Sequence, residues 1–373
     1  MEFLFNSFTA ITWQQVVMIA LGILLILLAI IKKTEPALLL PMGFGAILVN
    51  LPFSAVNSTE GAVGIIDGLF EFGISASEMM PLLLFIGIGA MIDFGPLLAN
   101  PKLFIFGAMA QFGIFATIAI AAASGFDIND AASIGILGAA DGPTAIFVAA
   151  KLGSKYLGPI MVAAYSYMAL VPIIQPAVIK MLTTKNERAI EMHYNPQSVS
   201  KATKIAFPIL VTIVSGLLAP MSVALVGFLM FGNLIRECGV LNNLSETAQN
   251  ALSNLITLLL GITIASQMKA ENFLQVDTLL IMSFGLLAFV FDTMSGVIAA
   301  KVFNLFSKTK INPMIGAAGI SAFPMSARVV AKLGTKENPQ NYLLMHSIGC
   351  NVSGQIASAI AGGLVLSLVS GMI

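Results

Sequence analysis

One carboxylate, Asp141, lies in an otherwise apolar stretch and is followed directly by Gly142 and Pro143, in the run GAADGPTAIF (138–147). An ionised carboxylate inside a lipid bilayer costs at least about 2.5–3.5 kcal/mol unless it meets water or a cation. No Lys or Arg lies near Asp141 in the sequence. A transported Na⁺ or H⁺ would satisfy this charge, and the Gly-Pro pair would free backbone carbonyls as further ligands. Asp141 is equally suited to cap a half-helix that begins with Pro143, and the two roles are compatible.

Neutral oxygen-bearing side chains recur in a second stretch, NPMIGAAGISAFPMSARV (312–329), and on one face of the last hydrophobic segment. Amide and hydroxyl oxygens beside a single carboxylate make a site of low charge, which suits a monovalent cation better than Ca²⁺. The candidate ligands are Asn312, Ser321, Asn351, Ser353, Gln355 and Ser358.

Two tyrosines and a second acidic cluster are further candidates. Tyr165 and Tyr167 lie deeper than Tyr156, which the pattern places at the lipid interface, so they do not fit the usual aromatic belt. Asp292 and Thr293 belong to an intramembrane polar cluster for which a structural and a functional role both stay open.

Basic residues follow the second stretch at Arg328, Lys332 and Lys336. Such charges usually signal topology, but here they would also attract an anionic group that arrives from the cytoplasm.

The elements that must position these residues are membrane helices. Of 373 residues, 58% are hydrophobic and 10% are charged. The apolar surface of such a chain exceeds what one soluble core can bury, which indicates a polytopic membrane protein. The formal net charge is zero and the basic residues are scattered, which excludes a nucleic-acid-binding surface. We expect no removable signal peptide, because no basic segment and cleavage site precede the first apolar run.

The sequence predicts an all-α fold with about ten transmembrane helices. A basic linker, 181–204, divides the chain, and the positive-inside rule places it in the cytoplasm. The expected spans are 15–31, 36–52, 79–97, 103–124, 156–179, 203–219, 221–236, 254–268, 277–300 and 341–370.

Two inverted repeats, 1–180 and 205–373, are indicated by the parity of the spans and by an echo in the sequence. The run from Gly138 to Gly153 resembles the run from Gly316 to Gly334. Each copy is interrupted by Gly and Pro and precedes the last helix of its half, which predicts re-entrant segments at about 129–153 and 311–334 that meet near the midplane, as in transporters. Small residues that pack helices together are the alternative explanation.

With these residues laid out, the chain resembles the β-subunit family of sodium-pumping, biotin-dependent decarboxylases, which act on oxaloacetate, glutaconyl-CoA or methylmalonyl-CoA. The resemblance covers nearly the whole length, and its most specific blocks are GAADGPTAIF, VAAYSYMALVPIIQP, NPMIGAAGISAFPMSARV and NVSGQIASAIAGG. It implies that Asp141, Tyr167 and Ser321 are catalytic and that Arg328 and Tyr167 bind carboxybiotin. By the same resemblance the Na⁺ ligands are Asp141, Asn312, Gly316, Ser321 and Asn351.

The resemblance also implies a mechanism and partners. This subunit would decarboxylate carboxybiotin on a separate biotin carrier protein, consume a proton and couple the reaction to outward Na⁺ transport across the bacterial inner membrane. A carboxyltransferase, a small membrane-anchored gamma or delta subunit and further copies of this chain are the expected partners. The compact chain favours an acyl-CoA substrate over oxaloacetate. The residues alone leave a second function open, a secondary Na⁺/H⁺ or Na⁺/carboxylate transporter without an enzyme partner.

Overall fold

The computed structural model describes residues 9–33, 35–59, 61–193 and 199–371, which form helices and no β-strand. Eight helices in these residues are long and apolar enough to cross a membrane, and a bent pair, Ile65–Ser75 with Met79–Met91, adds a ninth if taken as one span. The polytopic all-α class is therefore confirmed. The predicted count of about ten is reached only when the shorter apolar helix Pro36–Asn50 is included.

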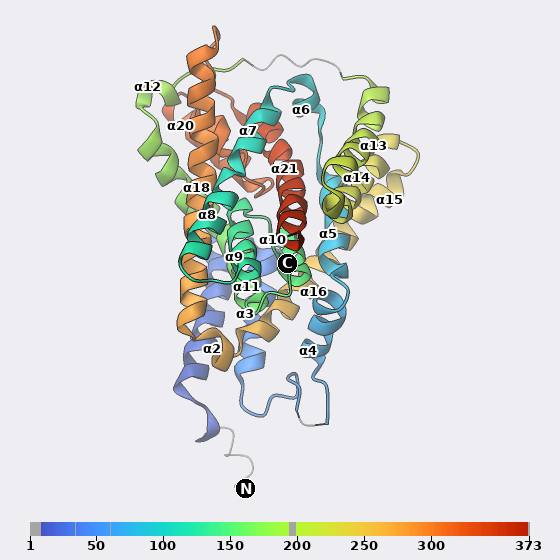
Figure 1. Ribbon diagram of the computed structural model, residues 1–373, viewed down its shortest axis with the longest axis vertical. Coiled ribbons are helices and arrows are strands. Elements are labelled where there is room, and N and C mark those ends of the chain that lie inside the picture. Colours follow the sequence, from blue (N-terminus) through green and yellow to red (C-terminus); the bar gives the residue numbers. More distant parts are fainter. Residues whose placement is uncertain (1–8, 34, 60, 194–198, 372–373) are drawn as a thin grey trace.

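The first half of the chain starts with a helical hairpin and ends with an interrupted segment and a long helix (Figure 1). Its elements are α2 (Trp13–Leu27), η1 (Leu28–Lys32), α3 (Pro36–Asn50), α4 (Ile65–Phe70), η2 (Glu71–Ser75), α5 (Met79–Met91), α6 (Gly95–Ala99), α7 (Leu103–Ala110), α8 (Phe112–Ala123), α9 (Ile128–Gly135), η3 (Ile136–Ala139), α10 (Gly142–Lys151) and α11 (Leu157–Leu182).

The second half follows the same order, and its long helix α18 runs along most of the molecule in Figure 1. Its elements are α12 (Lys185–Arg188), α13 (Lys201–Leu218), η4 (Pro220–Ser222), α14 (Val223–Cys238), α15 (Asn242–Thr247), η5 (Ala248–Leu252), α16 (Ser253–Ile264), η6 (Ala265–Met268), α17 (Ala270–Phe273), α18 (Val276–Phe306), α19 (Met314–Ala317), α20 (Met325–Glu337) and α21 (Leu344–Ser370).

The helix contacts of the two halves match one another. The hairpin α2–α3 corresponds to α13–α14, and the contact of α3 with α16 corresponds to that of α14 with α5. Likewise, α11 packs on α18 while α21 packs on α7, and each interrupted segment contacts the long helix that follows it, α10 on α11 and α20 on α21. Such pairing is what two structural repeats would give, and their opposite orientation in the membrane stays a prediction.

Residues 65–75 differ from the prediction, because the expected spans ended at 52 and began again at 79 and so left these residues outside any helix. They form α4 and η2, and this helical stretch is bent by 67° against α5. The acidic residue Asp67 made the stretch look too polar for a helix packed on the others. Its charge is paired, because Lys269 Nζ lies 2.9 Å from Asp67 Oδ2 and the backbone N–H of Ser58 donates to the same oxygen.

The linker is docked on the ends of two helices rather than free of them. Arg188 Nε lies 3.0 Å from Glu337 Oε1 on α20, and Lys301 Nζ on α18 lies 3.0 Å from Glu187 Oε1. Partial burial raises the pKa of Glu187, but hydrogen bonds from Thr184 and Lys301 outweigh it and lower the pKa overall. The described part of the linker therefore lies against the helix ends that flank the second interrupted segment.

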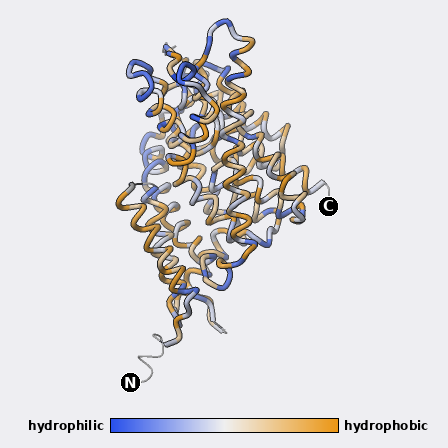
Figure 2. The backbone as a smooth tube through the Cα atoms, turned by 90° about the vertical axis from the view of Figure 1, so that its left-hand side faces the viewer, coloured by the Kyte–Doolittle hydropathy of each residue, from blue (hydrophilic) through white to orange (hydrophobic). Residues whose placement is uncertain are grey.

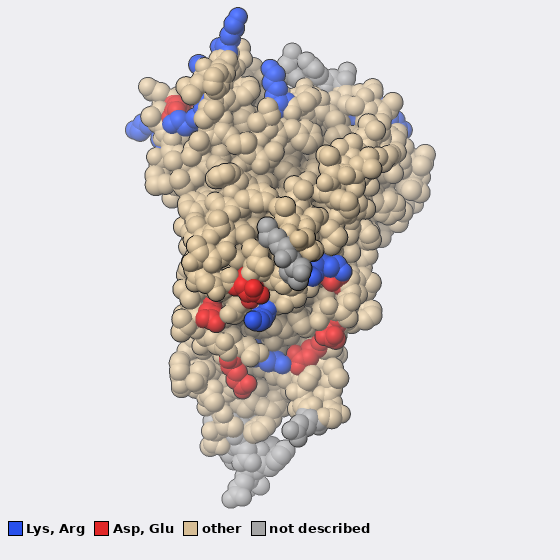
Figure 3. Space-filling view, viewed as in Figure 1, with Lys and Arg blue, Asp and Glu red and all other residues tan. Residues whose placement is uncertain are grey.

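The outer helices present apolar side chains where lipid would lie. Only 17% of the most apolar stretch of α13 and 22% of that of the α2 span are buried, against 72% for α21, which lies centrally. In Figure 2 the upper loops are mostly hydrophilic and the helices below them mostly hydrophobic. On the face in Figure 3, charged side chains gather at the upper end and in a band across the lower half, with an uncharged zone between them. This pattern is typical of a multi-pass membrane protein.

Candidate ion-binding site

Asp141 lies where the first interrupted segment passes from η3 into α10. The preceding Ala140 has a left-handed backbone (φ 52°), which turns the chain, and Pro143 occupies the first turn of α10, where its missing N–H costs nothing. The Asp141 side chain is 4% exposed. Its Oδ2 accepts hydrogen bonds from Thr144 Oγ1 at 2.6 Å and from Ser358 Oγ on α21 at 3.1 Å.

The two interrupted segments touch directly beside this carboxylate. The backbone N–H of Ser321 donates to the carbonyl of Ala139 at 2.9 Å. The Ser321 hydroxyl donates to the Gly354 carbonyl on α21 at 2.9 Å, and the Gln355 amide donates to the Ser321 carbonyl. Helix α21 therefore fastens the second segment where it meets the first.

A cavity of about 150 Å³ opens at this junction, and some of the oxygen atoms in its wall have no hydrogen-bond partner among the described residues. Asp141, Ser321 and Gln355 line it together with Tyr165 and Glu35. Among the described residues, the Tyr165 hydroxyl and Gln355 Oε1 are buried and accept or donate no hydrogen bond. Buried polar atoms are normally satisfied, so a site that leaves two of them open around a carboxylate fits a small cation.

The charge at the site is low. None of the ion pairs among the described residues includes Asp141. In the same part of the chain, no three His, Cys, Asp or Glu side chains cluster as they would around a multivalent metal ion. One carboxylate with hydroxyl and amide oxygens is a set of ligands with low charge, which suits a monovalent cation better than a multivalent one.

Tyr165, and not Tyr167, lies beside Asp141 in this structure. The ring of Tyr165 packs on Gly142, where a built Cβ would lie 2.4 Å from the ring. Tyr167 faces α18 instead, because its hydroxyl donates to the carbonyl of Met282 and its ring packs on Gly285. Residues two apart on a helix point in nearly opposite directions, so only one of the pair can face the cavity.

Asn312 and Gly316 are buried away from this cavity. The Asn312 amide donates to the carbonyls of Arg188 at 2.7 Å and Ile190 at 3.0 Å, and its Oδ1 accepts from the Met314 N–H. Gly316 packs against α18 so closely that a Cβ would lie 2.0 Å from a carbonyl oxygen there. The structure thus brings Asp141 and Ser321 together at the cavity. Asn312 and Gly316 instead hold the second interrupted segment against the linker and α18.

Asn351 is buried and Arg328 is exposed, and neither residue lines the cavity. The Asn351 amide on α21 donates to the carbonyls of Ala318 and Ile320, and its buried Oδ1 has no partner among the described residues. Arg328 is exposed on α20, and its positive charge acts on Glu35 at the edge of the cavity. Sequence reasoning missed Glu35, because nothing in the sequence links the α2–α3 turn to Asp141.

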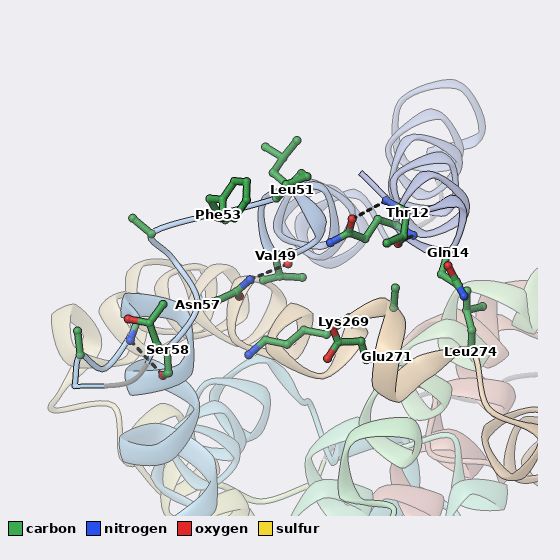
Figure 4. Close-up of a pocket in the computed structure, with 18 of the residues that line it drawn as sticks. Thr12, Gln14, Val49, Leu51, Phe53, Asn57, Ser58, Lys269, Glu271 and Leu274 are labelled. Atoms are coloured by element: carbon green, nitrogen blue, oxygen red, sulfur yellow. Dashed lines mark hydrogen bonds between the residues drawn. The ribbon is translucent and has the colours of Figure 1, made fainter. Parts of the chain in front are cut away.

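A larger cavity lies elsewhere, between the start of α2, residues 51–59 and 62–64, and α17 (Figure 4). Its volume is about 910 Å³. The amide of Asn57 donates to the Val49 carbonyl in its wall, and Lys269 is already paired with Asp67. This cavity contains none of the predicted site residues, so its size alone does not make it the functional site.

A buried carboxylate in a cavity where two interrupted segments meet, within a bundle of membrane helices, is typical of transporter-like membrane proteins. The sequence matches the profile of Na⁺-transporting oxaloacetate decarboxylase beta subunits over residues 14–369. The chain belongs to this family, so it is a membrane component of a Na⁺-transporting decarboxylase, in the inner membrane of a bacterium.

Individual relatives come from three decarboxylases. The chain is 48% identical to the methylmalonyl-CoA decarboxylase subunit beta of Propionigenium modestum, over 97% of both chains. It is 46% identical to the glutaconyl-CoA decarboxylase subunit beta of Acidaminococcus fermentans, over 98% of this chain and 96% of the relative. Identity to a probable oxaloacetate decarboxylase beta chain of Vibrio cholerae is 45%, over 96% of each. The family resemblance is confirmed, and the stand-alone transporter is not supported.

Proposed function

We infer that the cavity at Asp141 binds Na⁺ and H⁺ in alternation and couples outward Na⁺ transport to the decarboxylation of carboxybiotin, which consumes a proton. The observation that carries this proposal is the Asp141 carboxylate, which is 4% exposed, accepts hydrogen bonds from two hydroxyls and has no cationic partner among the described residues. A carboxylate in such a place is neutral only when it holds a proton or a cation.

The proposed ligands are those whose oxygens face the cavity or have no partner. Asp141 supplies the charge, and Ser321, Gln355 and the Tyr165 hydroxyl supply neutral oxygens. Asn351 supplies its free Oδ1 from the same helix as Gln355. Asn312 and Gly316, also implied by the family resemblance, would act by positioning the second segment, because their contacts are to the linker and to α18.

Exchange of Na⁺ for H⁺ at one carboxylate provides the coupling rule. Moving one Na⁺ outward against about 100 mV costs about 2.3 kcal/mol, so release of CO₂ without ion movement must be prevented. If the proton consumed by decarboxylation is delivered to Asp141, Na⁺ leaves when the proton arrives. The hydroxyls of Thr144 and Ser358 donate their protons to the carboxylate, and each keeps oxygen lone pairs that it can offer to the bound cation.

Arg328 is the proposed contact for the carboxylate of carboxybiotin. Arg328 is exposed on α20, its charge acts on Glu35 at the cavity edge, and guanidinium groups match carboxylates in shape and charge. Tyr167, the other residue implied to bind carboxybiotin, would first have to break its bond to Met282. Biotin itself would be carried by a partner, with a carboxyltransferase and a small membrane-anchored gamma or delta subunit completing a complex that holds several copies of this chain.

The substrate of the partner carboxyltransferase is proposed to be an acyl-CoA. Alignments with the methylmalonyl-CoA and glutaconyl-CoA relatives span 383 and 366 positions, whereas alignment with the Vibrio cholerae oxaloacetate relative spans 418. The 373-residue chain is therefore closer in length to the acyl-CoA relatives. Identification of the carboxyltransferase that co-purifies with the chain tests this choice.

The proposed function is tested by the Na⁺ dependence of decarboxylation in the purified complex. We expect CO₂ release to require Na⁺ and to be lost in Asp141→Asn, because an amide can neither hold the proton nor balance the cation. Asp277→Asn is the matched control, since this carboxylate lies at the exposed start of α18 and bonds only Tyr156 among the described residues. Na⁺-stimulated turnover in Asp141→Asn would refute the assignment.

A further inference from the structure

A second buried carboxylate, Asp292, lies in the middle of α18 and is 0% exposed. Its Oδ1 accepts a hydrogen bond from the backbone N–H of Ile114 at 3.1 Å, at the break where α7 ends and α8 begins. Its Oδ2 has no hydrogen-bond partner among the described residues. One oxygen therefore caps a broken helix, and the other is buried without a partner.

The free oxygen points toward the segment that carries Asp141. A Cβ built on Gly138 would lie 2.6 Å from Asp292 Oδ2, and one built on Gly113 would lie 2.3 Å from Oδ1. Only glycine therefore fits at either position. The carboxyl of Asp292 is held between the α7–α8 break on one side and η3 on the other, three residues before Asp141.

The internal repeat allows Asp292 to be compared with the residue at the same position in the first half, Gln111. Gln111 precedes Asp292 by 181 positions, and Gly138 precedes Gly319 by the same spacing. The Gln111 amide, at the same α7–α8 break, donates to the Gly319 carbonyl of the second interrupted segment at 3.3 Å. Asp292, in the second repeat, takes the place of Gln111 and faces Gly138 of the first repeat, which the shared spacing of 181 residues pairs with Gly319. An amide is always a donor at this position, whereas a carboxyl is a donor only when it carries a proton.

Neither an ion pair nor a cavity explains why a carboxyl is buried at Asp292. None of the ion pairs among the described residues includes it, and it lines neither of the two cavities described above. The titratable groups on the elements packed against α18 are Tyr165, Tyr167 and Lys180 on α11, Asp130 on α9 and Asp141 after η3. A fully buried carboxyl oxygen with glycine backbone packed against it suits a proton, the smallest ligand that a carboxylate can hold.

We propose that Asp292 is a second, proton-binding carboxyl, which donates from Oδ2 to the first interrupted segment and holds it against α18 in the conformation seen here. Release of this proton would leave an unpaired negative charge buried against η3 and free the segment to move. Asp292 is thus a positioning residue for the Asp141 segment. Its coupling to transport rests on the proposed function of Asp141, but its protonation does not.

Infrared difference spectroscopy of the purified complex tests the protonation directly. We expect the spectrum between neutral and alkaline pH to contain the carbonyl band of a protonated carboxyl, and this band to vanish in Asp292→Asn and persist in Asp141→Asn. If the Asp292→Asn spectrum keeps the band unchanged, the proposal is wrong. Because no turnover is required, that result would leave the assignment of Asp141 intact.

Turnover separates an exchanging proton from a fixed one. Asp292→Asn keeps both hydrogen bonds of the neutral acid, so we expect the complex to assemble, bind as much ²²Na⁺ as the wild type and decarboxylate about tenfold more slowly. Its rate should no longer vary with pH where the wild-type band titrates. Ser295→Ala, which removes a hydroxyl bonded to the Ala110 and Asp292 carbonyls, is the control and should keep its pH dependence. Wild-type turnover or reduced Na⁺ binding in Asp292→Asn would overturn the proposal.

Discussion

Replacement of Ser358 by alanine removes one of the two hydroxyls that donate to Asp141. Ser358 lies on α21, is fully buried, and its Oγ is 3.1 Å from Asp141 Oδ2. The single Ser358 O–H is shared with the Gln355 carbonyl, also at 3.1 Å, and the backbone hydrogen bonds of α21 do not depend on this side chain. The change therefore acts on the ionised carboxylate, which is the form that binds Na⁺, with little effect on the fold.

The size of the effect follows from the type of bond. A hydrogen bond to a charged group contributes about 1.5–3 kcal/mol, and about 1.4 kcal/mol is a factor of ten in affinity. We expect the Na⁺ concentration for half-maximal decarboxylation to rise about ten- to hundredfold in Ser358→Ala. The rate at saturating Na⁺ should stay close to that of the wild type, because the carboxylate itself is retained.

The assay is CO₂ release by the reconstituted complex as a function of Na⁺ concentration. Ser367→Ala is the matched control on the same helix, since its hydroxyl donates to the Gly363 carbonyl and does not face the cavity. If Ser358→Ala has the same Na⁺ requirement as the wild type, the hydroxyl does not act on the ion site. An equal shift in both variants would show a general effect on α21 instead.

Three further substitutions test the packing and the choice of tyrosine. Gly316→Ala places a Cβ 2.0 Å from the facing carbonyl oxygen of α18. We expect this variant to lose decarboxylation and to be destabilised by about 1–3 kcal/mol in thermal unfolding. Gly227→Ala is the control, because its Cβ would lie 3.9 Å from the nearest atom. Tyr165→Phe should raise the Na⁺ requirement without lowering stability, because its hydroxyl is unpaired in the cavity. Tyr167→Phe should lower stability by about 1 kcal/mol and leave the Na⁺ requirement unchanged, and the reverse pattern in the tyrosine pair would contradict the geometry.

Hydrophobic runs and helix breakers predicted the class of fold and the interrupted segments from the sequence. A run of about twenty apolar residues specifies a membrane helix whatever surrounds it, and Gly142-Pro143 interrupts a helix for local steric reasons. The 65–75 helix was missed because Asp67 and Glu71 suggested a loop, and only the distant Lys269 accounts for the Asp67 charge. Residues that are 202 apart in the chain give no local signal.

Only some of the residues predicted for the site lie at the cavity, again because contacts between distant residues leave no local signal in the sequence. Asp141 and Ser321 stood out because each lies beside a helix breaker, and the structure places them at one cavity. Tyr165 and Tyr167 are neighbours of one type, so their sequence cannot tell which faces the cavity; the direction of α11 decides it. Asn312 has the right chemistry for a cation ligand, but its amide is already bonded to two linker carbonyls.

The central claim is that one carboxylate couples the two processes, and the ratio of Na⁺ transported to CO₂ released tests it most directly. Inverted vesicles that contain the complex are supplied with ²²Na⁺, and uptake and CO₂ are measured in the same sample for the wild type and Asp141→Asn. The account predicts a fixed ratio in the wild type at every rate of turnover and the loss of both activities in the variant. Uptake of Na⁺ that continues in Asp141→Asn, or CO₂ release that continues without it, would contradict the account.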